Sequence, residues 1–385
     1  MRIVLAPDSF KESMTAREAA AAMERGVRAV LPDAECAVLP MADGGEGTVD
    51  ALLAALGGEL VTVRVTGPMG APVDAAYGWV ADERLAIIEV AAAVGIDLVP
   101  VADRDPWRAS STGVGEMLVD ALDRGARRLV VGLGGTVTND GGAGMLRSLG
   151  VRFLDATGAD LVGAGVPLGP DALGRLAQVD ASGLDPRVAD VEVDLASDVT
   201  NPLLGLEGAS VVFGPQKGAT PEVVERLEVA LTVLGGHLVA LGGRDVSVVP
   251  GAGAAGGLGA AFLAVCDAHV RSGIEVVMDA AHLDDVLVGA DVVFTGEGSV
   301  DAQTAQGKAP FGVAQAARRA GVPVVVFAGR VEAAAEVLYA HGVHAVVPIA
   351  RGACDLATAL REGAANLEAA VATTCRLLQL GRPQR

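Results

Sequence analysis

Aromatic side chains are scarce in this chain of 385 residues, which has two Trp, two Tyr and seven Phe. Proteins that bind single-stranded nucleic acid usually stack the bases on aromatic side chains, so this composition argues against that function. The formal net charge is −19, and an acidic surface repels nucleic acid and anionic membranes. We therefore expect small-molecule partners, and an anionic substrate would need a local pocket of positive charge.

Cysteine is also rare, and no two cysteines have the C-x-x-C spacing of redox or zinc sites. Such a pattern indicates free thiols in a cytoplasmic protein. The first apolar segment is interrupted at Asp8, before a signal-peptide core is complete. The longest uncharged run, residues 246–266, contains Pro250 and five glycines, so we expect no membrane span. The sequence leaves the oligomeric state open, with a homodimer as one option.

Lysine is the rarest basic residue, because only three of the 29 basic positions of Lys and Arg are Lys. All three lie in loop-like motifs: "PDSFKES", "FGPQKGA" and "AQGKAP". A compact ammonium on a flexible stem suits a phosphate or a carboxylate in a tight pocket better than a planar guanidinium does. The alternative is that loops are simply where cations usually sit. We interpret Lys11, Lys217 and Lys308 as active-site residues.

The apolar pattern predicts an α/β fold. A strand at residues 3–6, a helix that a Thr15–Glu18 capping box opens, a strand at 37–41 and a helix to residue 56 form a β-α-β-α start. Three consecutive strands at 61–65, 73–80 and 85–90 then indicate a mixed or antiparallel region. The alternation returns near residue 290, where "DVVFTGEGS" reads as a strand followed by a loop. Helices are expected at 309–320, 333–339 and 356–378.

The simplest arrangement is a discontinuous, Rossmann-like, doubly wound domain that contains a second, inserted, mixed α/β domain. The first domain would comprise residues 1–59 plus 288–385, and the inserted domain residues 60–287. The active site would lie in the cleft between them, where the carboxyl ends of strands present their loops.

Glycine and acidic residues cluster at the expected strand ends. "VVGLGGTVTNDGGAGM", residues 130–145, turns from a buried strand at 129–133 to a helix at 143–149, and its bare backbone N–H groups form a ready anion site. Carboxylates occur in five comparable loops, although each one alone is also typical of an ordinary turn. Phosphoryl transfer requires carboxylates for the hydroxyl proton and Mg²⁺, and cations and N–H groups for the phosphate. The five loops contain Asp8, Asp43 with Glu46, Asp140, Asp194 with Asp198, and Glu297 with Asp301.

A rival interpretation comes from Gly251, Gly253 and Gly256, which match the G-x-G-x-x-G dinucleotide fingerprint. A strand is expected before this loop and a helix after it, so an NAD-dependent oxidoreductase is the alternative function. Against it, Pro250 interrupts the approach and Asp279 comes later than the usual acidic residue.

Eight motifs together resemble the type I glycerate kinase family, the bacterial glycerate kinases. They occur in the family's order from residue 6 to residue 310, and only Glu12 departs, at a position where the family often has glycine. The resemblance implies ATP- and Mg²⁺-dependent phosphorylation of D-glycerate in the cytoplasm, usually to 2-phosphoglycerate, with 3-phosphoglycerate as the alternative product. The motifs are "APDSFKES", "PMADGGEGT", "ASSTGVGE", "GLGGTVTNDGGAGM", "ASDVTNPLLG", "VFGPQKGA", "PGAGAAGGLG" and "FTGEGSVDAQTAQGKAP".

The motifs also suggest a role for each candidate residue. Asp198 is the expected general base, with Asp194 and Asp43 as alternatives, and Lys11, Lys217 and Lys308 would stabilise the transferring charge. Glycerate would bind near Asp8, Ser9, Lys11, Asp43 and Arg64. The triphosphate would meet Gly134, Gly135, Thr136, Thr138 and Asn139, and also Gly296, Gly298 and Ser299. Asp43, Asn201, Glu297 and Asp301 are the expected Mg²⁺ ligands.

Overall fold

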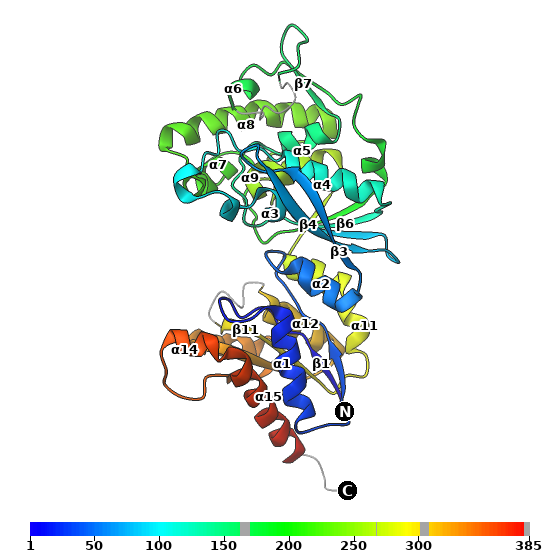
Figure 1. Cartoon of the computed structure of the whole chain (residues 1–385), viewed down its shortest axis with the longest axis vertical. Coiled ribbons are helices and arrows are strands. Elements are labelled where there is room, and N and C mark those ends of the chain that lie inside the picture. The colour runs from blue at the N-terminus through cyan, green and yellow to red at the C-terminus, as the bar shows by residue number, and fades with distance from the viewer. Residues whose placement is uncertain (162–169, 267, 301–307, 381–385) are drawn as a thin grey trace. The chain divides into compact units, whose positions relative to one another are not determined.

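The structure, a computed structural model, describes residues 1–161, 170–266, 268–300 and 308–380 (Figure 1). The chain divides into two compact units. Unit 1 comprises Met1–Asp43, Asp50–Gly57 and Ile274–Arg385, and unit 2 comprises Gly44–Val49 and Gly58–Gly273. The predicted domain boundaries lay between residues 59 and 60 and between residues 287 and 288. The structure differs at the second boundary, because it assigns residues 274–287 to unit 1.

Unit 1 is built on a sheet of five parallel strands in the order β13-β12-β11-β1-β2. Numbered by their sequence within the unit, the strands run 2-1-3-4-5. This is the flavodoxin-like order of a doubly wound sheet and not the 3-2-1-4-5-6 order of the Rossmann fold. The strands are β1 (Arg2–Leu5), β2 (Glu35–Val38), β11 (Val292–Val300), β12 (Val324–Val331) and β13 (Val343–Pro348).

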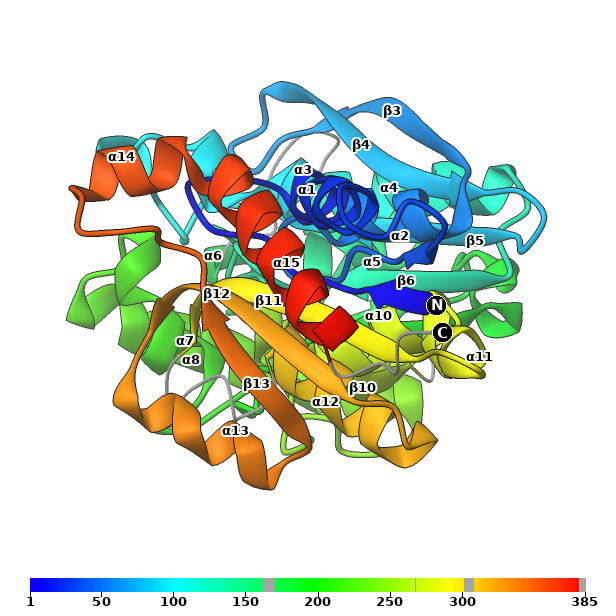
Figure 2. The ribbon, with the colours of Figure 1, turned by 90° about the horizontal axis from the view of Figure 1, so that it is seen from below.

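Helices cover both faces of this sheet (Figure 2). Helices α1 (Ala16–Arg28) and α15 (Gly363–Leu380) pack side by side on one face, and α12 (Ala309–Ala320) lies on the other. Their apolar sides meet the strands in a core that includes Phe294 and Phe327, whose rings pack edge to face at 5.4 Å. The predicted Thr15–Glu18 capping box is present at the start of α1. The other helices of this region are α2 (Thr48–Leu56), α10 (Gly273–Ala280), α11 (Leu283–Leu287), η6 (Ala333–Glu336), α13 (Val337–Ala340) and α14 (Leu356–Arg361).

Two sequence expectations in unit 1 are wrong. The "GEGS" segment is not a loop, because β11 continues through it and pairs with β12 as far as Val300. The single helix expected at 356–378 is two helices, α14 and α15, which meet at Gly363. A Cβ atom at Gly363 would lie 2.2 Å from the Ser13 hydroxyl, so the close approach of the Ser13 loop requires glycine there.

Unit 2 contains a six-stranded mixed sheet in the order β10-β9-β6-β5-β4-β3. The first four strands are parallel, whereas β4 and β3 pair as consecutive antiparallel strands, which confirms the predicted mixed region. A separate two-stranded ribbon pairs β7 with β8. The strands are β3 (Glu59–Thr66), β4 (Pro72–Val80), β5 (Leu85–Glu89), β6 (Arg128–Gly132), β7 (Arg152–Leu154), β8 (Gln178–Asp180), β9 (Glu192–Ala196) and β10 (His269–Arg271).

The helices of unit 2 enclose a large hydrophobic core that includes Met117, Leu234 and Phe262. Among the residues described here, no helix has the length and hydropathy needed to cross a membrane. The helical elements are α3 (Ala91–Val94), η1 (Ile96–Leu98), η2 (Val101–Asp103), α4 (Thr112–Asp123), α5 (Ala143–Ser148), α6 (Pro170–Leu173), η3 (Pro186–Asp190), α7 (Ala209–Phe213), η4 (Pro215–Lys217), α8 (Pro221–Gly242) and α9 (Ala254–Val265).

Candidate active site

A cavity of about 420 Å³ in unit 1 gathers eight of the predicted site residues. They come from three places: the segment after β1, the segment after β2, and the end of β11 with the start of α12. The carboxyl ends of parallel strands meet at one edge of a sheet, which explains the clustering. The eight residues are Asp8, Ser9, Lys11, Asp43, Glu297, Gly298, Ser299 and Lys308.

The loop after β1 is held in place by backbone hydrogen bonds. The Asp8 N–H donates to the Gly296 carbonyl at 2.9 Å, and Phe10 and Met14 exchange two hydrogen bonds that close the turn between them. Phe10 is buried in the unit 1 core. Glu12 occupies the turn with a φ of +62°, in the left-handed region that favours glycine, the residue that the family resemblance led us to expect there.

Carboxylates and lysines lie together in this cavity. Glu297 is buried, and its carboxylate lies 3.7 Å from the Lys308 ammonium. Burial raises the pKa of Asp8 to about 7, and the negative charges of Asp43 and Glu297 add to this effect, while hydrogen bonds from Ser9 oppose it. Asp8 can therefore take up or release a proton near neutral pH.

The predicted Mg²⁺ ligands are only partly brought together. Asp43 and Glu297 line the same cavity and offer the oxygen atoms that Mg²⁺ prefers. Asn201 belongs to unit 2, where its amide donates to the Glu207 carbonyl at 2.8 Å. Asp301 lies outside the described residues. Within the described ranges, no group of three or more His, Cys, Asp or Glu side chains has metal-binding geometry.

In unit 2, the segment between β6 and α5 is held by Asp140. Its buried carboxylate accepts hydrogen bonds from the Ser111 N–H and hydroxyl, both at 2.8 Å, and from the N–H groups of Gly142 and Gly144 at 3.1 and 3.2 Å. Burial raises the pKa of Asp140, and these four hydrogen bonds oppose the shift. Asp140 therefore ties this segment to the starts of α4 and α5.

Lys217 is 2 % exposed, and its ammonium points at this same segment. It donates to the Thr138 carbonyl at 2.7 Å and to the Thr136 hydroxyl at 3.4 Å. Burial lowers the pKa of Lys217 to about 7, and the negative charge of Asp140 opposes the shift. In this conformation the ammonium holds the backbone of residues 136–138.

The predicted triphosphate segment has an exposed and a buried part. Gly134 and Gly135 are exposed, whereas Thr136, Thr138 and Asn139 are buried. The Asn139 amide donates to the Ser210 hydroxyl at 3.0 Å. Of this segment, the two glycines are thus the residues most open to a ligand.

Gly296 lies within β11 of unit 1, packed against the Phe327 carbonyl, and is not among the residues that line the cavity. Three further predicted residues lie in unit 2. Asp194 is buried in β9, 3.8 Å from the Arg271 guanidinium, and Asp198 accepts a hydrogen bond from the Gly273 N–H at 3.1 Å. Arg64 is exposed on the β3–β4 hairpin, where it pairs with Asp74 at 2.9 Å. The expectation that the active site lies in a cleft between two domains stays a prediction.

The G-x-G-x-x-G loop does not have the form of a dinucleotide site. Residues 246–253 form turns rather than the expected strand. A Cβ atom would lie 2.2 Å from the Pro202 carbonyl at Gly253 and 2.0 Å from the Thr138 carbonyl at Gly256. These glycines allow close packing of protein backbone, which leaves no room for a pyrophosphate.

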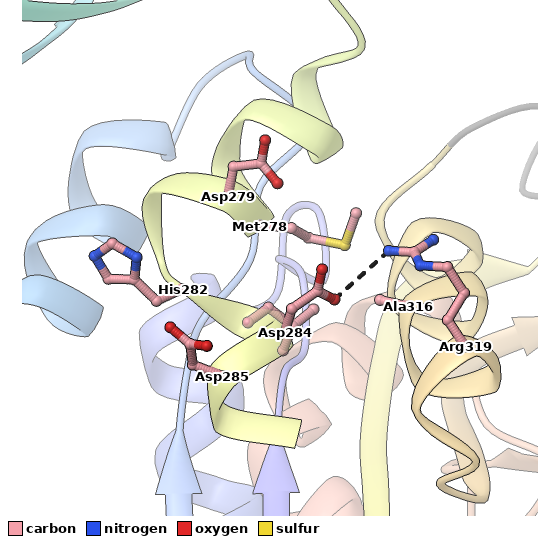
Figure 3. Close-up of a pocket in the computed structure, with 8 residues that line it drawn as sticks. Met278, Asp279, His282, Asp284, Asp285, Ala316 and Arg319 are labelled. Carbon is pink, nitrogen blue, oxygen red and sulfur yellow. Dashed lines mark ion pairs between the residues drawn. The ribbon is translucent and has the colours of Figure 1, made fainter. Parts of the chain in front are cut away.

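A second hollow in unit 1, of about 200 Å³, lies against α10, α11 and α12 (Figure 3). Asp284 points toward Arg319, and their charged groups are 3.5 Å apart. His282 points away from this pair. None of the predicted site residues lies here. Arg64 is the one predicted residue among the described residues that line a third hollow, of about 640 Å³, in unit 2. The cavity of about 420 Å³, which gathers eight predicted residues, is therefore the candidate active site.

Several residues that line the cavity of about 420 Å³ were not predicted. They come from the end of β13, from α14 and from the start of α15. A signal was available, because "VVPIARG" ends a strand as the other loops do, and Asn366 is one of only three asparagines in the chain. These residues are Ile349, Ala350, Leu356, Ala359, Leu360, Gly363 and Asn366.

Known proteins are similar to this chain over almost its whole length. A family model described as the glycerate kinase family matches residues 3–379. The chain belongs to the glycerate kinase family. A glycerate kinase of Bacillus subtilis is 45 % identical over 368 residues, which is 96 % of this chain and 95 % of the relative. A glycerate 2-kinase of Escherichia coli is 43 % identical over 381 residues, 99 % of each chain.

A crystal structure of a glycerate kinase 2 from Salmonella typhimurium LT2 superimposes with a TM-score of 0.90. It is 48 % identical in sequence, and the match covers 99 % of both chains. The predicted α/β fold is confirmed. This protein is therefore an enzyme, a kinase.

Proposed function

We propose that this kinase transfers the γ-phosphoryl group of ATP to the 2-hydroxyl of D-glycerate, giving 2-phosphoglycerate and ADP. The observation that supports this most strongly is the unit 1 cavity, which combines two of the three lysines with four carboxylates, those of Asp8, Glu12, Asp43 and Glu297. The name of the Escherichia coli relative, glycerate 2-kinase, favours the 2-position. The alternative product is 3-phosphoglycerate. The buried G-x-G-x-x-G loop argues against the NAD-dependent alternative.

The residues of the cavity suit the separate tasks of phosphoryl transfer. Lys11 and Lys308 would neutralise the glycerate carboxylate and the phosphate, because a compact ammonium serves either anion. Asp8 would take the hydroxyl proton, since a base is most effective when its pKa lies near the working pH. Asp198, Asp194 and Asp43 remain alternatives for this role.

Mg²⁺ is part of the proposal. Asp43 and Glu297 would hold it, with Asn201 and Asp301 as further predicted ligands. The ion would neutralise charge on the phosphates. Gly298 and Ser299, at the end of β11, would contact the triphosphate from within the same cavity. Gly134 and Gly135 stay predicted phosphate contacts in unit 2. We place the reaction in the cytoplasm.

The test is ADP formation by the purified protein with Mg²⁺-ATP and a panel of three-carbon acids. D-Glycerate carries both hydroxyls, D-lactate only the 2-hydroxyl and 3-hydroxypropionate only the 3-hydroxyl. We expect fast turnover with D-glycerate, slow turnover with D-lactate and none with 3-hydroxypropionate. Turnover with 3-hydroxypropionate but not D-lactate would favour the 3-position, and no acid-dependent turnover would contradict the proposal.

A further inference from the structure

The unit 1 cavity has an apolar side that glycerate does not explain. Ile349, Leu356 and Leu360, from the end of β13 and from α14, line this side. Glycerate carries an oxygen on each of its three carbons and has no apolar surface to bury. At about 420 Å³ the cavity falls within the roughly 300–1,000 Å³ of pockets that hold drug-sized ligands, so a larger molecule fits it.

Among the described residues that line this cavity, Asn366 is the one with an amide side chain. It projects from α15 and is 8 % exposed, yet its side chain makes no hydrogen bond to any residue that the structure describes. Such a group in the wall of a cavity points to a ligand that supplies the missing hydrogen bonds.

We propose that the apolar side of the cavity binds the adenine base of the nucleotide, and that the Asn366 amide recognises the edge of the base. This inference rests on the proposed function, which supplies ATP as the substrate. The faces of a purine are apolar and suit the aliphatic wall. An asparagine amide presents a donor beside an acceptor, which matches the N7 and N6 positions of adenine, whereas guanine offers two acceptors there.

The apolar side is attached to the loop that carries Lys11. The Ser13 hydroxyl donates to the Leu360 carbonyl at 2.6 Å, and Gly363 permits the close approach of the two segments. A base held against α14 therefore leaves its phosphates in the same cavity as Lys11 and Lys308.

The first test replaces Asn366 by Leu, which keeps the size of the side chain and removes both polar atoms. We expect the KM for ATP to rise about tenfold and the preference for ATP over GTP to fall by a similar factor, because a bidentate contact of this kind is worth about 1–3 kcal/mol. The KM for D-glycerate should stay within twofold. Thr374→Val is the matched control, since Thr374 is buried to the same 8 % on the same helix and bonds only the Ala370 carbonyl.

A second pair of variants provides a test that does not depend on the folding of Asn366→Leu. Leu356→Ser changes an exposed leucine of the cavity wall, and Leu377→Ser changes a comparably exposed leucine of α15 outside it. We expect only Leu356→Ser to weaken the binding of adenosine, measured by calorimetry. Adenosine carries no phosphate, and its binding needs no turnover.

The outcomes separate this inference from the proposed function. A raised KM for D-glycerate with an unchanged KM for ATP would place the acid on the apolar side and overturn the base subsite. Equal adenosine binding by the wild type, Asn366→Leu and Leu356→Ser would overturn it too. Adenosine binding that both variants weaken, in a protein that does not turn over D-glycerate, would support the subsite and contradict the glycerate reaction.

Discussion

Asp8 lines a cavity together with Asp43 and Glu297, whose negative charges act on its carboxylate. Its pKa of about 7 lies above the value of about 3.9 for an unfolded chain. Between these pH values the folded state binds more protons than the unfolded state, so the Asp8 contribution to stability is full below about pH 4 and is lost as the pH rises to about 7.

The Asp8→Asn variant tests this directly. Because Asn does not titrate, we expect the stability of the variant, relative to wild type, to improve between pH 4 and pH 8 in urea unfolding. Its kcat should fall by about 10²- to 10⁴-fold, the usual contribution of a general base. In the wild type, kcat/KM should decline below about pH 7. A stability difference that is equal at both pH values would show that Asp8 has an ordinary pKa.

Glu12 illustrates a backbone constraint that its side chain does not reveal. Its φ of +62° costs a non-glycine residue about 1–2 kcal/mol. We expect Glu12→Gly to be at least as stable as wild type despite the greater freedom of glycine in the unfolded chain, and Glu12→Val to be less stable by about 1–2 kcal/mol. Both variants remove the same charge, so thermal unfolding of the pair isolates the backbone effect. Equal stability of the two variants would contradict a left-handed backbone conformation at residue 12.

The three lysines show how far residue-level inference from the sequence extends. Their scarcity directed attention to Lys11 and Lys308, and both line the candidate site. Lys217 has the same sequence signal, a lysine in a glycine-containing loop, but it is buried against the Thr138 carbonyl. Local sequence cannot distinguish these environments, because the burial of Lys217 depends on the packing of segments distant in the chain.

At the scale of elements, the Asp140 carboxylate holds the segment between β6 and α5 to the starts of α4 and α5. Asp140→Asn would replace one charged acceptor oxygen by an NH₂ group facing N–H donors. We expect a loss of at least about 2 kcal/mol in the free energy of unfolding, since hydrogen bonds to charged groups contribute about 1.5–3 kcal/mol each. Asp155→Asn is the control, because its carboxylate accepts similar bonds from Thr157 and Ala159 at an exposed turn. Similar losses in both variants would show that burial of Asp140 does not matter.

The sequence predicted elements well where local periodicity decides them. The helix at 309–320 and the β3–β4–β5 strands follow from capping, turn residues and alternation. It failed at "GEGS", where glycine suggested a loop but β11 continues. There, a Cβ atom at Gly296 would lie 2.3 Å from the Phe327 carbonyl, so the glycine serves close strand packing. That distinction requires knowledge of the neighbouring strand.

At the scale of the whole molecule, the two units each contain a segment predicted to bind phosphate. Hydrogen exchange can distinguish them without any turnover. We expect ADP with Mg²⁺ to slow amide exchange in residues 8–12 and 297–299 of unit 1, because the cavity lies there. Strands β5 and β6 of unit 2 serve as the internal reference. Protection confined to residues 134–139 would assign the nucleotide to unit 2.

Sequence analysis could predict only part of the domain division and of the cavity lining, because both depend on which distant segments pack together. Chain order suggested which segments form each domain, but the division at Gly273 rather than residue 287 depends on where α10 and α11 pack. Residues 349–366 contribute to the cavity from the last part of the chain, where the sequence signals were the strand end at "VVPIARG" and one of three asparagines. Parallel β-α topology brings them to the same sheet edge as Asp8.

The most direct test of the central claim is the phosphorus NMR spectrum, recorded without proton decoupling, of D-glycerate after reaction with Mg²⁺-ATP and this protein. The phosphorus of 2-phosphoglycerate neighbours a single proton through three bonds, so we predict a new phosphomonoester doublet that grows with the ADP signals. A triplet would identify 3-phosphoglycerate and move the reaction to the other hydroxyl. A spectrum with no new phosphomonoester signal would contradict the assignment of this protein as a kinase of glycerate.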